Sequence, residues 1–122
     1  MRRRILLVED SRTYAQYLQI FLAPLCEELK FEIVHVTRRS EADRALPVVD
    51  GVILDAMLED SRHESSWQDT CDLWSNYLPV VVHSSRQGLS HGEALIIPKY
   101  GSVSEILEQF RGWLKSIYGE VP

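Results

Sequence analysis

Five polar residues whose side chains could carry out chemistry each stand at the end of a short apolar run. They are Glu9, Asp10, Asp55, Ser84 and Lys99. Clustered carboxylates repel one another unless a positive charge offsets them, and the hard cation Mg²⁺ prefers carboxylate, water and phosphate oxygens. Beside such a metal and Lys99, the Asp55 carboxylate would stay ionised and could attack a phosphoryl group. The Lys99 ammonium and the Ser84 hydroxyl could then bind the phosphoryl oxygens.

Each of these residues, taken alone, also has an ordinary structural interpretation. Asp10 could only cap a helix, Asp55 could only cap a turn, and Lys99 could be a surface lysine. In an open parallel α/β sheet, however, the carboxyl ends of the strands meet at one edge, and ligand sites form there. Because four separate apolar runs all end on such groups, we favour one shared site.

The elements that would position this site are predicted from the apolar pattern. Short apolar runs and, at Phe31–Val36, an alternating pattern predict strands, and apolar residues at helical spacing predict helices between them. The predicted strands are Ile5–Val8, Phe31–Val36, Val52–Leu54, Pro79–Val82 and Leu95–Pro98. The predicted helices run from Tyr14 to Leu25, from Ser40 to Leu46, from Trp67 to Tyr77, and from Ser102 or Ser104 to Ile117. This alternation indicates a single α/β domain with a parallel sheet over residues 1–122.

Local signals refine the helices. Asp10 or Ser11 is expected to cap the first helix, and Pro24 to kink or end it unless the chain continues for one more turn. Ser40 is expected to cap the second helix. Residues 85–94 alone connect the fourth and fifth strands, and a crossover with its helix needs about ten to twelve residues. The fourth helix is therefore expected to be short or missing.

The composition narrows the class of protein. The 122-residue chain is 45% hydrophobic and 25% charged, as an ordinary globular domain is. Its net charge of −5 gives no reason to expect nucleic-acid binding, and no apolar run approaches the roughly 20 residues of a membrane span. Cys26 and Cys71 lie in apolar helical patterns and are expected to be reduced, and Trp67 and Trp74 to lie in the core. Because the N-terminus lacks a signal-peptide pattern, we expect a cytoplasmic protein.

Four short motifs carry a resemblance to a known family. In order, "ILLVEDS", "GVILDAML", "LPVVVHSS" and "LIIPK" resemble the receiver domains of two-component response regulators, over roughly Arg4 to Ile117. The resemblance implies a flavodoxin-like (CheY-like) fold, which is a doubly wound five-stranded parallel sheet with flanking helices. It also implies Mg²⁺-dependent acceptance of a phosphoryl group from a sensor histidine kinase or a phosphotransfer protein, and not an enzyme with an external substrate. A homodimer or a downstream protein would receive the output, and Tyr77 and Tyr100 could mark such a surface.

The resemblance also implies a role for each candidate residue. Asp55 would be the phosphoryl acceptor, with Ser84 and Lys99 contacting the phosphoryl group. The metal ligands would be Asp55, Asp10, Glu9 (mainly through water) and the backbone carbonyl of Met57.

The sequence departs from the family pattern in places, and two alternatives stay open. Glu59 stands where the family usually has proline, and Ile96 is aliphatic where an aromatic switch residue is usual. One alternative is a pseudo-receiver, a protein-interaction module that phosphorylation does not regulate. The other is an aspartate-nucleophile phosphatase of the haloacid dehalogenase type. That family has a second acid two residues after its nucleophile, where this chain has Met57.

Overall fold

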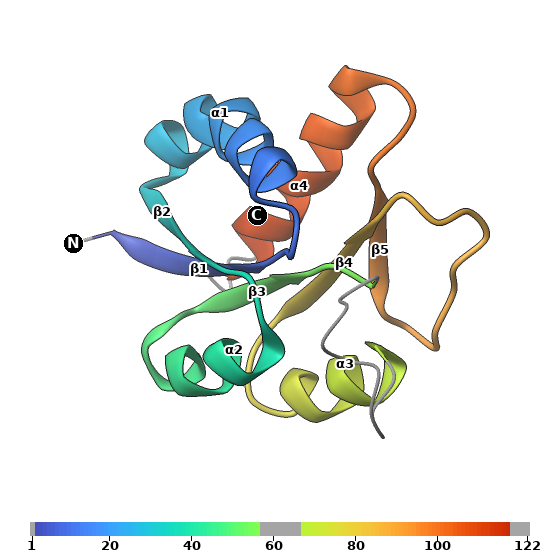
Figure 1. The fold of residues 1–122 in the computed structure, drawn as a ribbon. Helices are drawn as coiled ribbons and strands as arrows, with labels where there is room; N and C mark the ends of the chain where they lie inside the picture. The colour runs from blue at the N-terminus through green and yellow to red at the C-terminus, as the bar shows by residue number, and fades with distance from the viewer. Residues whose placement is uncertain (1, 57–66, 118–122) are drawn as a thin grey trace.

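The computed structural model describes residues 2–56 and 67–117, and it contains one five-stranded sheet with helices on both faces (Figure 1). The strands are β1 (Arg3–Val8), β2 (Phe31–Val36), β3 (Gly51–Leu54), β4 (Val80–Ser84) and β5 (Leu95–Pro98). The helices are α1 (Arg12–Leu29), α2 (Arg39–Ala45), α3 (Trp67–Ser75) and α4 (Val103–Ile117), with a 3₁₀ turn η1 (Leu46–Val48). Neighbouring strands pair in parallel in the order β2-β1-β3-β4-β5. This is the flavodoxin-like order, so the predicted fold class is confirmed.

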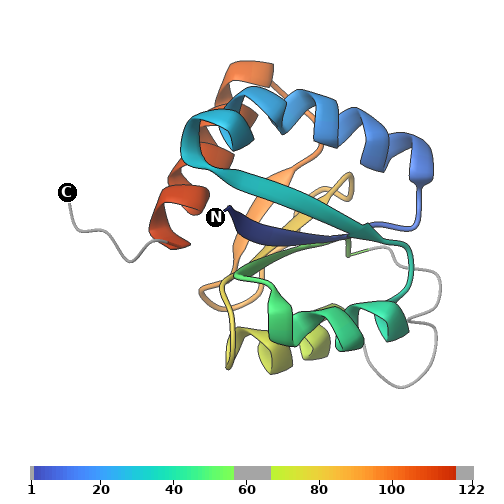
Figure 2. The ribbon, with the colours of Figure 1, turned by 90° about the vertical axis from the view of Figure 1, so that its left-hand side faces the viewer.

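The helices form two layers, with α1 and α4 on one face of the sheet and α2 and α3 on the other (Figures 1 and 2). Successive side chains of a strand point to opposite faces, so β1 contributes to both layers. Ile5 and Leu7 belong to the core that includes α1 and α4, while Leu6 and Val8 belong to the core that includes α3. A central strand covered on both faces has to be apolar throughout, which explains the unbroken run in the sequence.

Helix α1 continues past Pro24, so of the two outcomes considered for this proline the continuation of the helix is the one found. The helix runs to Leu29, one turn beyond the proline. Pro24 lacks one backbone N–H, but it faces solvent, and the neighbouring Leu22 and Leu25 are buried and hold the last turns against the sheet. Of the two caps considered, Ser11 is the one found, because its side chain accepts a hydrogen bond from the backbone N–H of Tyr14 at 3.1 Å.

Two predicted helix boundaries were wrong. Helix α2 is capped at Arg38, not at Ser40. The Glu41 carboxylate accepts from the backbone N–H of Arg38 at 3.1 Å and of Thr37 at 3.3 Å, and so ties the third position of the helix to the backbone that precedes it. Helix α3 ends at Ser75, and Tyr77 lies in the following turn with 75% of its surface exposed.

Side chains expected in the core are found there. Trp67 and Trp74 are 7% and 1% exposed, and Cys71 is buried beside them. Cys26 is half-buried, and both cysteines are free thiols. Tyr100 is 45% exposed, as expected of a residue at the surface.

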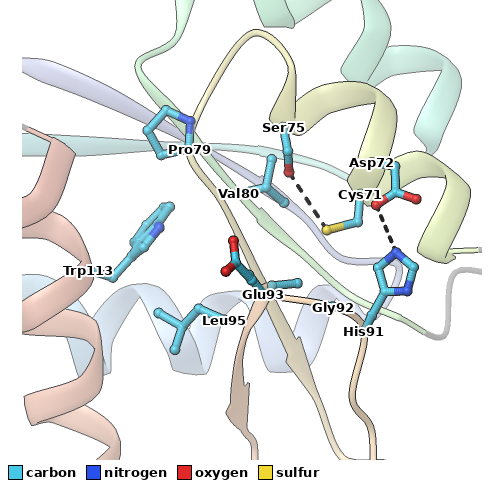
Figure 3. Close-up of a pocket in the computed structure, with 11 residues that line it drawn as sticks. Cys71, Asp72, Ser75, Pro79, Val80, His91, Gly92, Glu93, Leu95 and Trp113 are labelled. Atoms are coloured by element: carbon cyan, nitrogen blue, oxygen red, sulfur yellow. Dashed lines mark hydrogen bonds and ion pairs between the residues drawn. The ribbon is translucent and has the colours of Figure 1, made fainter.

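The connection from β4 to β5 has no helix, as the short crossover predicted. Residues 85–94, all of them described, form turns in which Gly88 and Gly92 adopt positive φ angles of 72° and 54°. Leu89 and Ala94 pack against the core on the α3 side of the sheet. A pocket beside this connection is lined by Cys71, Asp72, Ser75, His91, Glu93 and Trp113 (Figure 3). It lies near the starts of β4 and β5, and so at the opposite edge of the sheet from the candidate site.

Among the described residues, no helix combines the length and apolar character that crossing a membrane requires.

Candidate functional site

Backbone pairing carries three candidate residues to one edge of the sheet. The N–H of Glu9 donates to the carbonyl of Val36, and the N–H of Asp55 donates to the carbonyl of Val8 at 3.0 Å. The N–H of Lys99 donates to the carbonyl of Ser84 at 2.9 Å. The hydrogen bonds between neighbouring strands therefore continue one residue beyond β1, β3 and β5. The side chains of these next residues, Glu9, Asp55 and Lys99, lie at the carboxyl edge of the sheet.

Three carboxylates gather at this edge. One ligand oxygen each of Glu9, Asp10 and Asp55 lies within 4.8 Å of the others. Glu9 and Asp55 are only 2% and 4% exposed, whereas Asp10 is partly open to solvent. Buried carboxylates need charged or hydrogen-bonding partners, because removing an ion from water is unfavourable. The cluster therefore depends on nearby positive charge.

Lys99 supplies positive charge to two of the three carboxylates. Its Nζ lies 2.6 Å from Glu9 Oε1 and 3.6 Å from Asp55 Oδ1, and its side chain is 13% exposed. Among these four residues, three carboxylates face one ammonium. A divalent cation would neutralise the two remaining negative charges, and the carboxylate oxygens are the ligands that Mg²⁺ prefers. The residues present therefore fit a magnesium ion.

Glu9 is held in place by further hydrogen bonds. Its second carboxylate oxygen accepts from the N–H of Ser11 at 3.1 Å. Its backbone carbonyl accepts from His35 Nε2 at 2.8 Å, across the edge between β1 and β2. Because both carboxylate oxygens accept from donors of the protein, the orientation of the Glu9 side chain is fixed by the chain itself.

Tyr14 and His83 are residues of this site that sequence reasoning missed. The Lys99 Nζ lies 4.2 Å from the centroid of the Tyr14 ring, a cation–π distance. The Tyr14 hydroxyl lies 2.6 Å from His83 Nε2, and His83 Nδ1 lies 2.7 Å from the carbonyl oxygen of Ile97. In the sequence Tyr14 belongs to the apolar stripe of its helix. Only its position four residues after Asp10 could have drawn attention to it.

Comparisons with known proteins give structural neighbours but no sequence relatives. No protein-family model matches the sequence, and no curated protein is significantly similar to it. A signal receiver domain of an HD domain-containing protein from Pseudomonas fluorescens is 21% identical, with a TM-score of 0.74, over 98% of this chain and 100% of that one. A response regulator receiver domain (CheY-like) from Methylobacillus flagellatus is 22% identical, with a TM-score of 0.69, over 96% and 99%. The chain has the receiver fold. A further neighbour is the signal receiver domain of a putative Luxo repressor protein from Vibrio parahaemolyticus, 21% identical with a TM-score of 0.74 over 97% and 94%.

Within the receiver fold, the remaining candidates can now be placed. Ser84 is the last residue of β4, 1% exposed, and its Oγ accepts from the N–H of Arg86 at 3.1 Å. Ile96 is half-buried on the α3 side of the sheet. Met57 and Glu59 lie outside the described residues. Glu9, Asp10, Asp55 and Lys99 thus come together, with Ser84 on the strand next to Lys99.

Acid is expected to destabilise this receiver fold through His83. Burial lowers the pKa of His83 to about 4, against about 6.5 for an unperturbed histidine. Between these values the unfolded chain binds a proton that the folded chain does not, so stability is full above about pH 6.5 and falls as the pH falls toward 4. From pH 7 to pH 5 we expect this residue to lower the free energy of unfolding by about 2 kcal/mol.

Urea unfolding of the wild type and of His83→Leu at both pH values measures this effect. The variant should lose about 2 kcal/mol less than the wild type over the same interval. Equal losses in the two proteins would show that His83 does not bear this pH dependence.

Proposed function

We propose that this chain is a phosphorylation-dependent receiver. Asp55 accepts a phosphoryl group from a phosphohistidine of a sensor histidine kinase or phosphotransfer protein, in the presence of Mg²⁺. The observation that carries the proposal is Lys99, whose ammonium lies between Glu9 and Asp55 at the carboxyl edge of a receiver fold. In this proposal residues 1–122 form one receiver domain of a cytoplasmic signalling protein, and the domain is a switch without an external substrate.

The acidic cluster would hold the metal. Glu9, Asp10 and Asp55 offer oxygens within 4.8 Å of one another, and Met57 is proposed to add its backbone carbonyl. Bound there, Mg²⁺ would supply positive charge to the transferring phosphoryl oxygens and lessen their repulsion by the carboxylates.

Three side chains of the protein have separate roles in the proposed phosphoryl transfer. An oxygen of Asp55 forms the bond to phosphorus while the bond from phosphorus to the donor's imidazole nitrogen breaks, and that nitrogen keeps the electron pair. The Lys99 ammonium, already 3.6 Å from Asp55 Oδ1, is placed to bind a phosphoryl oxygen. Ser84 offers its hydroxyl as a further donor from the end of β4. The product is an acyl phosphate on Asp55.

A pseudo-receiver is the second candidate, and two observations favour it. The β4–β5 connection lacks a helix, and Ile96 is aliphatic. A chain with this surface could bind a partner without responding to phosphate. The two candidates differ in whether a phosphoryl mimic changes the structure.

The distinguishing experiment adds beryllofluoride to ¹⁵N-labelled protein that is already saturated with Mg²⁺, so that shifts caused by the metal alone are present in the reference spectrum. A phosphorylation-dependent receiver should show amide shifts at Glu9, Asp10, Asp55 and Lys99, and also at residues beyond the site, because the mimic binds a carboxylate and reorganises its neighbours. The Asp55→Asn variant, treated in the same way, should show neither set. A wild-type spectrum that is unchanged would favour the pseudo-receiver.

A further inference from the structure

Tyr14 lies between the candidate site and the core beneath α4. Its ring faces the Lys99 ammonium at 4.2 Å, and its hydroxyl reaches His83. His83 is 2% exposed and packs edge-on against the buried Phe110 of α4, with ring centroids 5.0 Å apart. Tyr14 is therefore supported from behind by a side chain that has little freedom to move.

The hydrogen-bond partners of His83 determine which of its ring nitrogens carries the hydrogen. The carbonyl of Ile97 can only accept, so His83 Nδ1 carries the hydrogen and donates at 2.7 Å. A neutral imidazole then has its lone pair at Nε2, and the Tyr14 hydroxyl donates to it at 2.6 Å. Burial and the nearby Glu9 raise the pKa of Tyr14, which keeps the phenol protonated and able to donate. The chain of donors runs from Tyr14 through His83 to the backbone of β5.

Lys99 has a shorter contact with Glu9 than with Asp55, and this matters once a metal binds. Its Nζ is 2.6 Å from Glu9 Oε1 but 3.6 Å from Asp55 Oδ1. A dication at the acidic cluster competes with the ammonium for the carboxylate of Glu9. Without another anchor, Lys99 would then be free to leave the site. The ring of Tyr14 is an anchor for which a metal does not compete.

We propose that Tyr14, oriented by His83, is a positioning residue that keeps the Lys99 ammonium beside Asp55 when a divalent cation occupies the acidic cluster. The inference rests on the proposed function, since it concerns the lysine of the same site. An aromatic side chain of α1 would thus assist the phosphoryl transfer by holding Lys99 in place, in addition to the residues at the strand ends.

The first test is the proton NMR signal of the Lys99 side chain. Protons over the face of an aromatic ring resonate upfield, so the Lys99 ε-methylene should lie upfield of those of the exposed Lys30 and Lys115. We expect this displacement to persist at saturating Mg²⁺ and to vanish in Tyr14→Leu. If Mg²⁺ shifts the amides of Glu9 and Asp10 while the Lys99 signal moves to the position of the other lysines, the inference is overturned.

The second test is the rate of phosphorylation by a small phosphodonor at saturating Mg²⁺. Tyr14→Leu, which removes the ring, should slow the reaction about fivefold or more. Tyr14→Phe keeps the ring but loses the bond to His83, and should slow it about twofold to fivefold, whereas Tyr17→Phe, one turn further along α1, should not. Unchanged rates in both Tyr14 variants would contradict the inference. A wild type that accepts no phosphoryl group would instead refute the proposed function, while the Lys99 signal would still report whether Tyr14 holds the lysine.

Discussion

Replacement of Lys99 by methionine is expected to lower the free energy of unfolding by about 3 kcal/mol in solution without divalent cations. The substitution keeps most of the side chain's volume but removes the ammonium from Glu9 and Asp55, which are 2% and 4% exposed. Losing one partner of a buried ion pair leaves charge in a place that water does not reach. Urea unfolding followed by circular dichroism measures the loss.

The matched control is Lys115→Met. Lys115 is an exposed lysine near the end of α4, and its substitution should change the free energy of unfolding by no more than about 0.5 kcal/mol. Adding Mg²⁺ should stabilise Lys99→Met more than the wild type, because the dication replaces the missing ammonium. If the two lysine variants are equally stable, Lys99 does not neutralise the cluster as described.

The sheet could be predicted from the sequence because four of its strands contain short apolar runs and β2 alternates between apolar and polar residues. A central strand such as β1 is covered on both faces, so Ile5 to Val8 contains no polar residue that would blur the pattern. The last residues of the strands could not be predicted in the same way, because pairing with the neighbouring strand decides where a strand ends. Ser84 belongs to β4 since it pairs with Pro98 of β5, a partner that periodicity in one segment does not reveal.

The helix boundaries that the sequence left open or misplaced depend on contacts made elsewhere in the chain. Pro24 lies inside α1 because the leucines around it are buried against the sheet, which outweighs the lost hydrogen bond. Arg38 caps α2 because the side chain of Glu41 folds back onto the preceding backbone. Neither arrangement follows from local propensity alone.

Some residues of the candidate site could be predicted from the sequence, and others could not. Glu9, Asp10, Asp55 and Lys99 could be grouped from the sequence because each follows a strand, and parallel strands end at one edge. Tyr14 could not be added, since its ring reaches Lys99 only through the way α1 packs across the sheet. His83 directly follows the predicted strand Pro79–Val82, and nothing in the sequence indicates that its ring lies between Tyr14 and Ile97.

Asp55→Asn is expected to abolish phosphoryl acceptance altogether. The amide keeps the shape of the side chain, but its neutral oxygen is a far weaker nucleophile than a carboxylate. The matched control is Asp43→Asn, at an exposed position on α2, which should accept as much phosphoryl group as the wild type.

Intact-mass spectrometry after incubation with a small phosphodonor tests the central claim most directly. We predict that the wild type gains the mass of one phosphoryl group with Mg²⁺ and much less without it, and that Asp55→Asn gains none. A wild type that gains no mass, or an Asp55→Asn variant that gains as much as the wild type, would contradict the assignment of Asp55 as the phosphoryl acceptor.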